Sequence, residues 1–343
     1  IFGERLAPPP DEGIKKLTLS LAAALRDSGH DVRLLTTGGA NWPEMGLTNI
    51  FADRLLRSAE LAAALRSFRP AAVIYVPTAS LTLASAARGR MLKRYAGGAP
   101  VALVATQGRR HNGAVRLAAR LLAPDLCAVQ SAVTLAQARA LGWRTVHLPP
   151  GVDLATFRPV SPTEKARLRA KHGLPVDRPV VLHAGHLNRS RGVHDLAAIA
   201  DLACPVLAAS TSTPQDVTLS EELAAAGVRL FTGYMPHIEE LYQAADAYLF
   251  PVPRDPLGPS SIDLPLSVLE AAACDLPVIT TRFGALPELW ADAAGVTFYE
   301  DRAALRRAVA QLRAGPGGTR RLAESFGWDA AANALLKGLL SGS

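Results

Sequence analysis

Residues 245–253 read A-D-A-Y-L-F-P-V-P, and residues 263–281 read D-L-P-L-S-V-L-E-A-A-A-C-D-L-P-V-I-T-T. The apolar run at 247–250 predicts a buried strand, and the prolines after it predict a loop. The loop leads into a helix that we expect to begin near Pro265, and a second strand follows at 277–280. This order of strand, helix and strand indicates a parallel sheet with crossover helices.

The start of that helix is a candidate anion site. Leu266 and Ser267 open the helix. The first N–H groups of a helix are unpaired and carry a partial positive charge, which suits a diphosphate. Glu270 lies in the first turns, where its carboxylate could accept hydrogen bonds from ribose hydroxyls. Spacing alone equally supports an ordinary sheet helix with Glu270 on a solvated face.

Residues 266–278, L-S-V-L-E-A-A-A-C-D-L-P-V, resemble the second half of the motif E-G-F-G-L-P-x-L-E-A-x-A-C-G-x-P-V of the retaining glycosyltransferases of family four. That family has the GT-B fold, so the resemblance implies an α/β protein with two Rossmann-like domains facing each other across a cleft. Glu270 matches the second Glu of the motif, which holds the nucleotide ribose. Ile262 replaces the first Glu, which contacts the transferred sugar, and Asp263 is the candidate substitute.

Three further segments resemble the family in the same order. Residues 148–159, L-P-P-G-V-D-L-A-T-F-R-P, are similar to its interdomain segment. Residues 184–192, A-G-H-L-N-R-S-R-G, are similar to the loop G-R-L-x-x-x-K-G, whose Arg and Lys hold the donor diphosphate. Residues 233–246 resemble the loop that contacts the base, here through the backbone of Met235 and Pro236. The resemblance therefore covers nearly the whole chain.

The resemblance assigns the diphosphate to the second of these segments. Arg191 stands at the family's Lys and would stabilise the leaving group, so it is a catalytic candidate. His186 stands at the family's Arg and is charged only when protonated. Arg189 lies in the same loop and could compensate, because guanidinium groups bind phosphate oxygens bidentately. The alternative is that both arginines are surface charges before a helix.

Other candidates lie in the N-terminal half. Gly13 begins a predicted helix and permits close backbone approach to a ligand, and Lys15 and Lys16 add charge beside it. In the family this loop lies near the diphosphate and the acceptor. The alternative is a proline-stiffened turn whose lysines face water.

Gln107 follows a predicted strand at 101–106, at a position where the family commonly has a His that contacts the transferred sugar. Gln107 is therefore the second catalytic candidate, and it can donate and accept hydrogen bonds but cannot titrate. Arg109 and His111 follow it and are candidate acceptor-binding residues. A lone loop histidine is also commonly just solvated.

The resemblance implies sugar transfer with retention from a nucleotide-diphosphate sugar, with UDP- and GDP-sugars as the first candidates. It implies no cofactor and no metal ion, and the sequence has no Asp-x-Asp motif. The acceptor would be a glycan or a lipid-linked molecule. The replacements at Ile262, Gln107 and His186 keep another hypothesis open, a non-catalytic GT-B subunit that binds nucleotide or supports a partner glycosyltransferase.

The length of 343 residues suits two domains. We expect an acceptor-binding domain at 1–150, a donor-binding domain at 151–325, and a C-terminal helix at 326–343 that returns to the first domain. No apolar run reaches the ~18–20 residues needed to cross a bilayer. The three cysteines are far apart, which favours reduced thiols in a cytoplasmic protein.

The net charge of +7 is unevenly distributed. Residues 81–120 hold no Asp or Glu but eight basic residues: Arg88, Arg90, Lys93, Arg94, Arg109, Arg110, Arg116 and Arg120. This basic segment favours peripheral contact with anionic lipid at the inner face of the membrane, or with a polyanionic acceptor. An Arg-rich solvated surface is the alternative. Nucleic acid is disfavoured, because the 6% of aromatic residues do not interleave with the basic ones.

Overall fold

The structure is a computed structural model that describes residues 1–109, 111–212, 215–253, 262–313 and 315–340. The chain forms two compact units. Unit 1 comprises Ile1–Gly151 and the described parts of 256–264 and 328–343, and unit 2 comprises the described parts of 152–255 and 265–327. Residues 262–264 fall in the second domain of the sequence-based division. They group with unit 1 because the Asp263 N–H donates to the Thr106 carbonyl oxygen at 2.8 Å.

Unit 1 is a seven-stranded sheet in the order β3-β2-β1-β4-β5-β6-β7, with all neighbouring strands parallel. The strands are β1 (Phe2–Glu4), β2 (Leu34–Thr37), β3 (Leu47–Asn49), β4 (Val73–Val76), β5 (Val101–Ala105), β6 (Leu126–Val129) and β7 (Thr145–His147). The helices are α1 (Gly13–Asp27), α2 (Ala59–Phe68), α3 (Leu83–Tyr95), α4 (Gly113–Leu121), α5 (Ala132–Ala140) and α14 (Trp328–Leu340), with a 3-10 turn η1 (Pro43–Met45).

Unit 2 is a six-stranded parallel sheet in the order β10-β9-β8-β11-β12-β13. The strands are β8 (Val180–Gly185), β9 (Cys204–Ala209), β10 (Arg229–Phe231), β11 (Ala247–Phe250), β12 (Val278–Thr280) and β13 (Val296–Phe298). The helices are α6 (Pro162–Lys171), α7 (His194–Ala197), α8 (Val217–Ala225), α9 (Glu239–Ala244), α10 (Leu266–Ala273), α11 (Leu286–Trp290), α12 (Arg302–Ala310) and α13 (Arg320–Ala323), with a 3-10 turn η2 (Arg189–Arg191).

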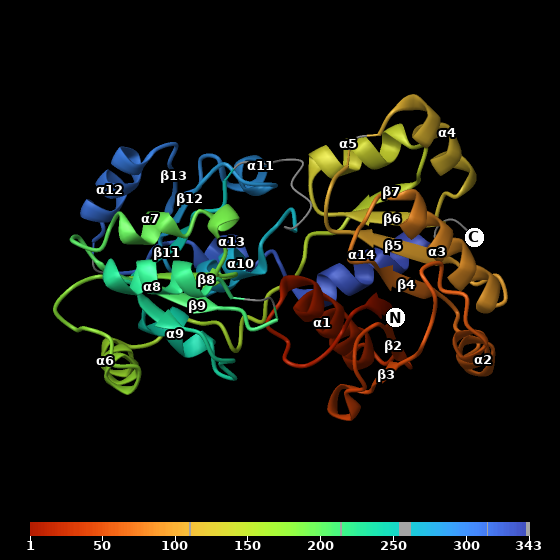
Figure 1. The fold of residues 1–343 in the computed structure, drawn as a ribbon, viewed down its shortest axis with the longest axis horizontal. Helices are drawn as coiled ribbons and strands as arrows, with labels where there is room; N and C mark the ends of the chain where they lie inside the picture. The colour runs from red at the N-terminus through yellow and green to blue at the C-terminus, as the bar shows by residue number, and fades with distance from the viewer. Residues whose placement is uncertain (110, 213–214, 254–261, 314, 341–343) are drawn as a thin grey trace. The chain divides into compact units, whose positions relative to one another are not determined.

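Both strand orders contain the 3-2-1-4-5-6 arrangement of a doubly wound Rossmann sheet. Figure 1 shows helices on both faces of each sheet. Because both faces are covered, the central strands are continuous apolar runs, and every residue of β5 is buried. The predicted α/β class with two Rossmann-like domains is therefore confirmed.

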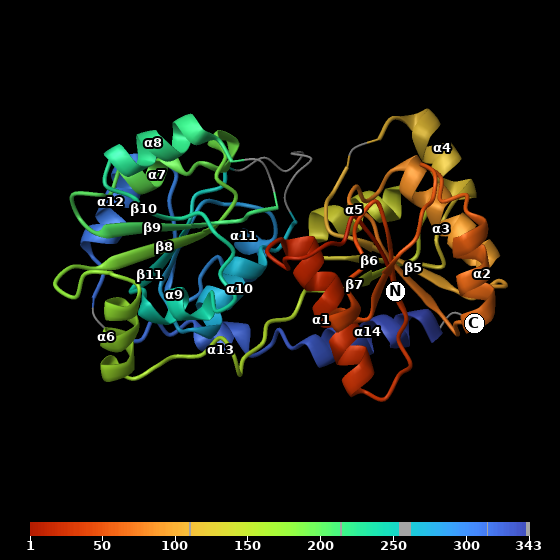
Figure 2. The same ribbon diagram turned by 60° about the horizontal axis from the view of Figure 1, so that its bottom comes forward.

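The C-terminal helix α14 belongs to unit 1 and packs along α1 and the strands β5 to β7 (Figures 1 and 2). Gly338 allows this close approach, since a Cβ atom there would lie 2.9 Å from Cδ2 of Leu126. The start of α14 is similarly tight, because a Cβ at Gly151 would lie 2.5 Å from Cδ2 of Trp328. The end of the chain thus completes the core of the first unit.

Helix α4 lies within the basic segment and exposes Leu117 and Leu121, whose relative exposures are 67% and 74%. Arg116 and Arg120 on the same helix are also exposed. Another member of the segment, Arg110, lies outside the described residues. None of the helices in the described residues is long and apolar enough to cross a membrane. The three cysteines are buried and form no disulfide.

Candidate active site

The strand order of unit 2 reverses between β8 and β11. In open α/β sheets, ligands bind at the carboxyl ends of the strands at such a switch point. Two predicted segments meet the ends of these strands: residues 186–192 follow β8, and the chain after β11 leads to α10. The geometry of these two segments therefore defines the candidate donor site.

The loop after β8 packs directly on the end of β11. Gly192 has a positive φ of 69°, and a Cβ at this position would lie 2.1 Å from the carbonyl oxygen of Pro251. Only glycine fits such a position without strain. Arg191, the preceding residue, is half-buried, and this desolvation lowers the pKa of its guanidinium. His186 begins the loop and is also half-buried. Arg191 is therefore a partly desolvated cation at the switch point.

Arg189 is engaged on another surface of the same unit. Its Nη1 and Nη2 donate to the two carboxylate oxygens of Glu222 at 2.9 and 2.8 Å, and its Nε lies 3.3 Å from Oδ2 of Asp216. These hydrogen bonds raise the pKa of Arg189. Both acidic residues belong to the start or body of α8. A phosphate role for Arg189 would require this ion pair to open, so Arg191 is the stronger candidate.

Glu270 lies in α10 and is only 5% exposed. The interpretation that places it on a solvated face is therefore wrong. Tyr242 donates its hydroxyl hydrogen to Oε2 of Glu270 at 2.9 Å, and its ring stacks on Tyr248 with the centroids 5.6 Å apart. The Tyr248 hydroxyl also hydrogen-bonds the Ser267 side chain and donates to the carbonyl oxygen of Ala184 at 3.2 Å. A tyrosine pair thus connects α10 to β8.

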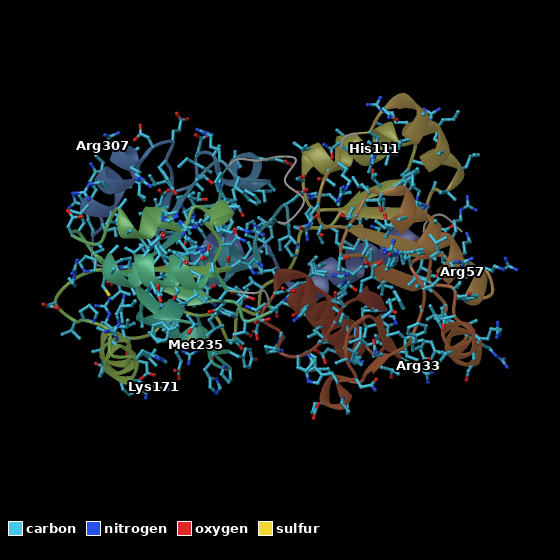
Figure 3. All side chains as sticks on the ribbon, viewed as in Figure 1. Arg33, Arg57, His111, Lys171, Met235 and Arg307 are labelled. Carbon is cyan, nitrogen blue, oxygen red and sulfur yellow. The ribbon has the colours of Figure 1, made fainter. Side chains whose placement is uncertain are left out.

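Helix α10 begins at Leu266, and no side chain caps its N-terminus. The N–H groups of Val268 and Leu269 donate to the Pro265 carbonyl oxygen. The N–H groups of Leu266 and Ser267 come first in the helix, at the position where anions bind other helix starts. The candidate base-contacting loop lies between β10 and α9, with Met235 half-buried and Pro236 exposed. Figure 3 labels Met235 on this loop.

The candidates of unit 1 near Gly13 form a compact turn. Gly13 is the first residue of α1. Lys15 is 7% exposed, donates from Nζ to the Pro9 carbonyl oxygen at 3.2 Å, and lies 3.7 Å from Oδ1 of Asp11. This lysine therefore ties the proline-rich turn to α1, whereas Lys16 is half-buried.

Gln107 follows β5 and is 6% exposed. Its backbone exchanges two hydrogen bonds with Oγ of Ser80, both at 3.1 Å, while its side-chain Oε1 is buried without a hydrogen-bond partner among the described residues. Arg109 is half-buried. His111, labelled in Figure 3, places Nε2 2.6 Å from the Leu81 carbonyl oxygen, so it is anchored to the protein and not simply solvated.

Asp263 is held within unit 1. Its carboxylate accepts hydrogen bonds from the hydroxyls of Ser131, at 2.6 Å, and Thr134, both at the start of α5. Ile262 lies against α1, since a Cβ at Gly13 would lie 2.9 Å from its Cδ1. The structure thus gives Asp263 a local anchoring role, and its donor contact stays a prediction.

Four buried polar side chains were missed by the sequence reasoning. Tyr242 donates a hydrogen bond to Glu270, as described above. His183 of β8 is 1% exposed, and its Nε2 has no partner among the described residues. Thr106 and Gln130 directly follow the neighbouring strands β5 and β6. Oγ1 of Thr106 and both amide atoms of Gln130 likewise lack partners within the described part of the chain. A polar residue inside an apolar run, as in V-V-L-H-A-G, is the signal that could have revealed His183.

No group of three or more His, Cys, Asp and Glu in the described ranges could hold a metal ion.

Residues 178–314 match the family model described as glycosyl transferases group 1. This part of the chain is similar to that family. The matched region spans the loop after β8, the candidate base-contacting loop and α10, so the candidate donor residues of unit 2 all lie within it. The resemblance predicted from the motifs is thereby confirmed.

Similar proteins include a D-inositol 3-phosphate glycosyltransferase of Xylanimonas cellulosilytica, 31% identical over 56% of this chain and 50% of its own length. Another is a GDP-mannose-dependent alpha-(1-6)-phosphatidylinositol monomannoside mannosyltransferase of Mycolicibacterium smegmatis, 32% identical over 50% of this chain and 47% of its own length. The chain thus spans about half the length of the curated relatives that it matches.

Solved GT-B structures share the fold over the whole chain. HepE of Anabaena in complex with UDP is 17% identical, covers 99% of both chains and superposes with a TM-score of 0.72. Sucrose-phosphate synthase of Thermosynechococcus elongatus is 20% identical, covers 100% of both chains and gives a TM-score of 0.71. These comparisons confirm the predicted GT-B fold.

Proposed function

We propose that this chain is a retaining glycosyltransferase that moves a sugar from a nucleotide-diphosphate sugar to a hydroxyl-bearing acceptor. The observation that carries the proposal is in unit 2. A partly desolvated Arg191 and a buried Glu270 flank the switch point of a Rossmann sheet, inside the region that is similar to glycosyl transferases group 1. A cation beside an uncapped helix start suits a diphosphate, and a buried carboxylate suits ribose hydroxyls.

Arg191 and the N–H groups of α10 would stabilise the departing diphosphate. Negative charge develops on the leaving group as the bond to the sugar breaks, so fixed donors in a water-poor site lower the barrier. The burial of Arg191 strengthens its interaction with such a charge. His186 would add a hydrogen bond, and a full charge when protonated. In this mechanism the protein needs neither a metal ion nor a cofactor.

Glu270 would hold the ribose through its carboxylate. Tyr242 occupies one of its oxygens and fixes the side chain, so the carboxylate is oriented before the donor arrives. Met235 and Pro236 would contact the base through backbone groups. Backbone groups are the same for every residue, so the sequence does not indicate which base is bound. The mannosyltransferase relative is named as GDP-mannose-dependent, and HepE was crystallised with UDP. These names support GDP- and UDP-sugars as the first donors to test.

The acceptor side would belong to unit 1. Thr106, Gln107 and Gln130 carry buried, uncharged polar atoms that lack partners in the described chain, and such groups suit sugar hydroxyls, which donate and accept. Lys16, Arg109 and His111 would lie at its rim. The relatives are named for inositol phosphate and phosphatidylinositol mannoside acceptors. We therefore propose a glycan or lipid-linked polyol as the acceptor class.

A peripheral membrane contact would follow from a lipid-linked acceptor. Helix α4 exposes Leu117 and Leu121 beside Arg116 and Arg120. Exposed leucines with flanking arginines are typical of helices that lie in an anionic lipid surface.

A second function is favoured by one feature of unit 1. Ile262, in place of the family's first Glu, packs on Gly13, so the group that would contact the transferred sugar is apolar here. A non-catalytic GT-B subunit would retain nucleotide binding through Arg191 and Glu270 but would not catalyse sugar transfer.

The test is turnover with UDP-glucose and GDP-mannose, each offered with myo-inositol, inositol phosphate and a phosphatidylinositol acceptor. Release of the nucleoside diphosphate is followed by chromatography in EDTA, and the anomeric configuration of the product is read by proton NMR. An α-linked product from the α-linked donor supports the proposal. An inverted product, or activity that disappears in EDTA, contradicts it, and nucleotide binding without turnover favours the non-catalytic subunit.

A further inference from the structure

His183 lies on β8, directly beside the switch point of unit 2. Its Nδ1 is 3.0 Å from the carbonyl oxygen of Leu249 on β11. A carbonyl oxygen can only accept a hydrogen bond, so Nδ1 must carry the hydrogen. The imidazole therefore bridges the two strands between which the sheet order reverses.

The same hydrogen bond fixes the chemistry of the other ring nitrogen. Burial strongly favours the neutral ring, and lowers the pKa of His183 to about 4. In a neutral ring whose Nδ1 is protonated, Nε2 is a bare lone pair that can only accept. That atom is buried and has no partner among the described residues. A buried unpaired acceptor is costly, so each such group in a native protein calls for a partner, which can be ordered water, an ion or a functional group.

The surroundings of Nε2 identify the group that it serves. Tyr248 and Phe250 flank the ring at centroid distances of 6.2 Å, and Gly185 leaves space, since a Cβ there would lie 2.9 Å from Nε2. Gly192 packs on Pro251, the residue after Phe250, so the loop that bears Arg191 lies next to a neighbour of the ring. The positive charge of Arg191 also lowers the pKa of His183. A guanidinium has five N–H donors and no acceptor, so it is a matching partner for a bare lone pair.

Resting on the proposed donor site, we propose that His183 is a positioning residue for Arg191. Its Nε2 accepts one N–H of the guanidinium when the donor is bound, and this fixes the remaining N–H groups towards the diphosphate. The residue is not itself a phosphate ligand, because a lone pair repels an anion. This role matters in this chain because His186 stands where the family has a permanent cation. Arg189 of the same loop pairs with Glu222, so Arg191 is the cation that we assign to the diphosphate.

Two substitutions test the roles of the two imidazole nitrogens separately. In His183→Asn, the short amide can still donate to the Leu249 carbonyl oxygen but places no atom at the position of Nε2. In His183→Gln, the longer side chain places an amide oxygen near that position. His183→Phe keeps the ring volume and removes both polar atoms. The affinity for UDP and for GDP is measured by calorimetry for the wild-type protein and these variants, alone and combined with Arg191→Ala.

We expect His183→Asn and His183→Phe to weaken binding of the preferred nucleotide about tenfold, as for loss of a hydrogen bond to a charged group. His183→Gln should recover most of that loss. In the Arg191→Ala background, His183→Asn should have little further effect, since coupled residues are not additive. If His183→Phe does not fold, the comparison of His183→Asn with His183→Gln still tests the inference.

Equal affinity in the wild-type protein and His183→Asn would overturn the inference and leave the donor site standing. A tenfold loss that persists in the Arg191→Ala background would also overturn it, because the lone pair would then serve the ligand directly. If the wild-type protein binds none of UDP, GDP, ADP, CMP and dTDP, the proposed donor site fails together with the inference.

Discussion

Tyr242 donates its hydroxyl hydrogen to Oε2 of Glu270 at 2.9 Å, inside unit 2 and away from solvent. Burial, reinforced by the negative charge of Glu270, raises the pKa of Tyr242 well above its usual value. The tyrosine therefore remains a donor at any working pH. Glu270 is thus an oriented carboxylate, supported by a residue that the donor need not touch.

Removing this hydroxyl should weaken nucleotide binding without removing Glu270, the proposed ribose ligand. We expect Tyr242→Phe to lower the affinity for the preferred nucleotide by about threefold to tenfold, which corresponds to a typical buried hydrogen bond of about 1 kcal/mol. Calorimetric titration measures the dissociation constant of the nucleotide for each protein. The control is Tyr299→Phe, because Tyr299 donates to Asp195 in the same unit at 2.8 Å, and an equal loss in that variant would contradict a specific role for Tyr242.

The two arginines of the loop after β8 should behave differently. Arg191→Ala should lower kcat and the nucleotide affinity by about tenfold or more each, because it removes a charge-assisted hydrogen bond from a partly buried site. Arg189→Ala should change either quantity less than about twofold, since its guanidinium pairs with Glu222. Steady-state kinetics of the two matched variants checks this. Equal losses would show that the Glu222 pair opens and that Arg189 also holds the diphosphate.

Asp263 should affect folding more than donor binding. Its carboxylate accepts from Ser131, which also accepts from the Thr134 N–H as the cap of α5. We expect Asp263→Ala to reduce the free energy of unfolding by about 1–3 kcal/mol, because it leaves partly buried hydroxyls without their acceptor. Urea denaturation measures the loss. A variant with unchanged stability but a tenfold weaker nucleotide affinity would instead support the predicted donor contact.

His183 makes the free energy of unfolding depend on pH in the acidic range. The unfolded chain protonates this imidazole below about pH 6.5, whereas the folded protein does so only at about pH 4. The unfolded state therefore binds more protons in this window, and stability falls as the pH drops through it. The two and a half pH units between these values correspond to about 3 kcal/mol.

His183→Phe cannot titrate, so it should lose less stability than the wild-type protein between pH 7 and pH 4.5. Urea denaturation at the two pH values, with exposed His237→Phe as the control, gives the difference. Identical losses in all three proteins would contradict a buried neutral imidazole at His183.

Much of this architecture could be predicted from the sequence, because local patterns of apolar and polar residues indicate each helix and strand. Continuous apolar runs such as β5 predicted parallel strands, and the motif around Glu270 predicted a helix start beside a ligand. The contacts that bring distant residues together left no such pattern. Nothing in the spacing indicates that Asp263 meets Ser131, or that Arg189 pairs with Glu222, because these partners lie on other elements. Buried acceptors such as Nε2 of His183 appear only when the surrounding side chains are in place.

The exposed leucines of α4 should support binding to anionic lipid. Leu117→Glu with Leu121→Glu should abolish sedimentation with phosphatidylglycerol vesicles, because the change removes apolar area and adds negative charge. Val176→Glu is the matched control, since Val176 is 70% exposed in unit 2. Binding of the wild-type protein should weaken with added salt. No binding by the wild-type protein, or equal binding by the double variant, would contradict the proposed contact.

The central claim is that unit 2 binds a nucleotide diphosphate through Arg191 and Glu270. The most direct measurement is thermal unfolding of the wild-type protein and Glu270→Ala with UDP, GDP, ADP, CMP and dTDP in separate samples. A nucleotide at ~100 times its dissociation constant stabilises the fold by ~2.7 kcal/mol. We predict a clear rise in Tm with one nucleotide, and its loss in Glu270→Ala. No rise with any nucleotide, or an equal rise in both proteins, would contradict the account.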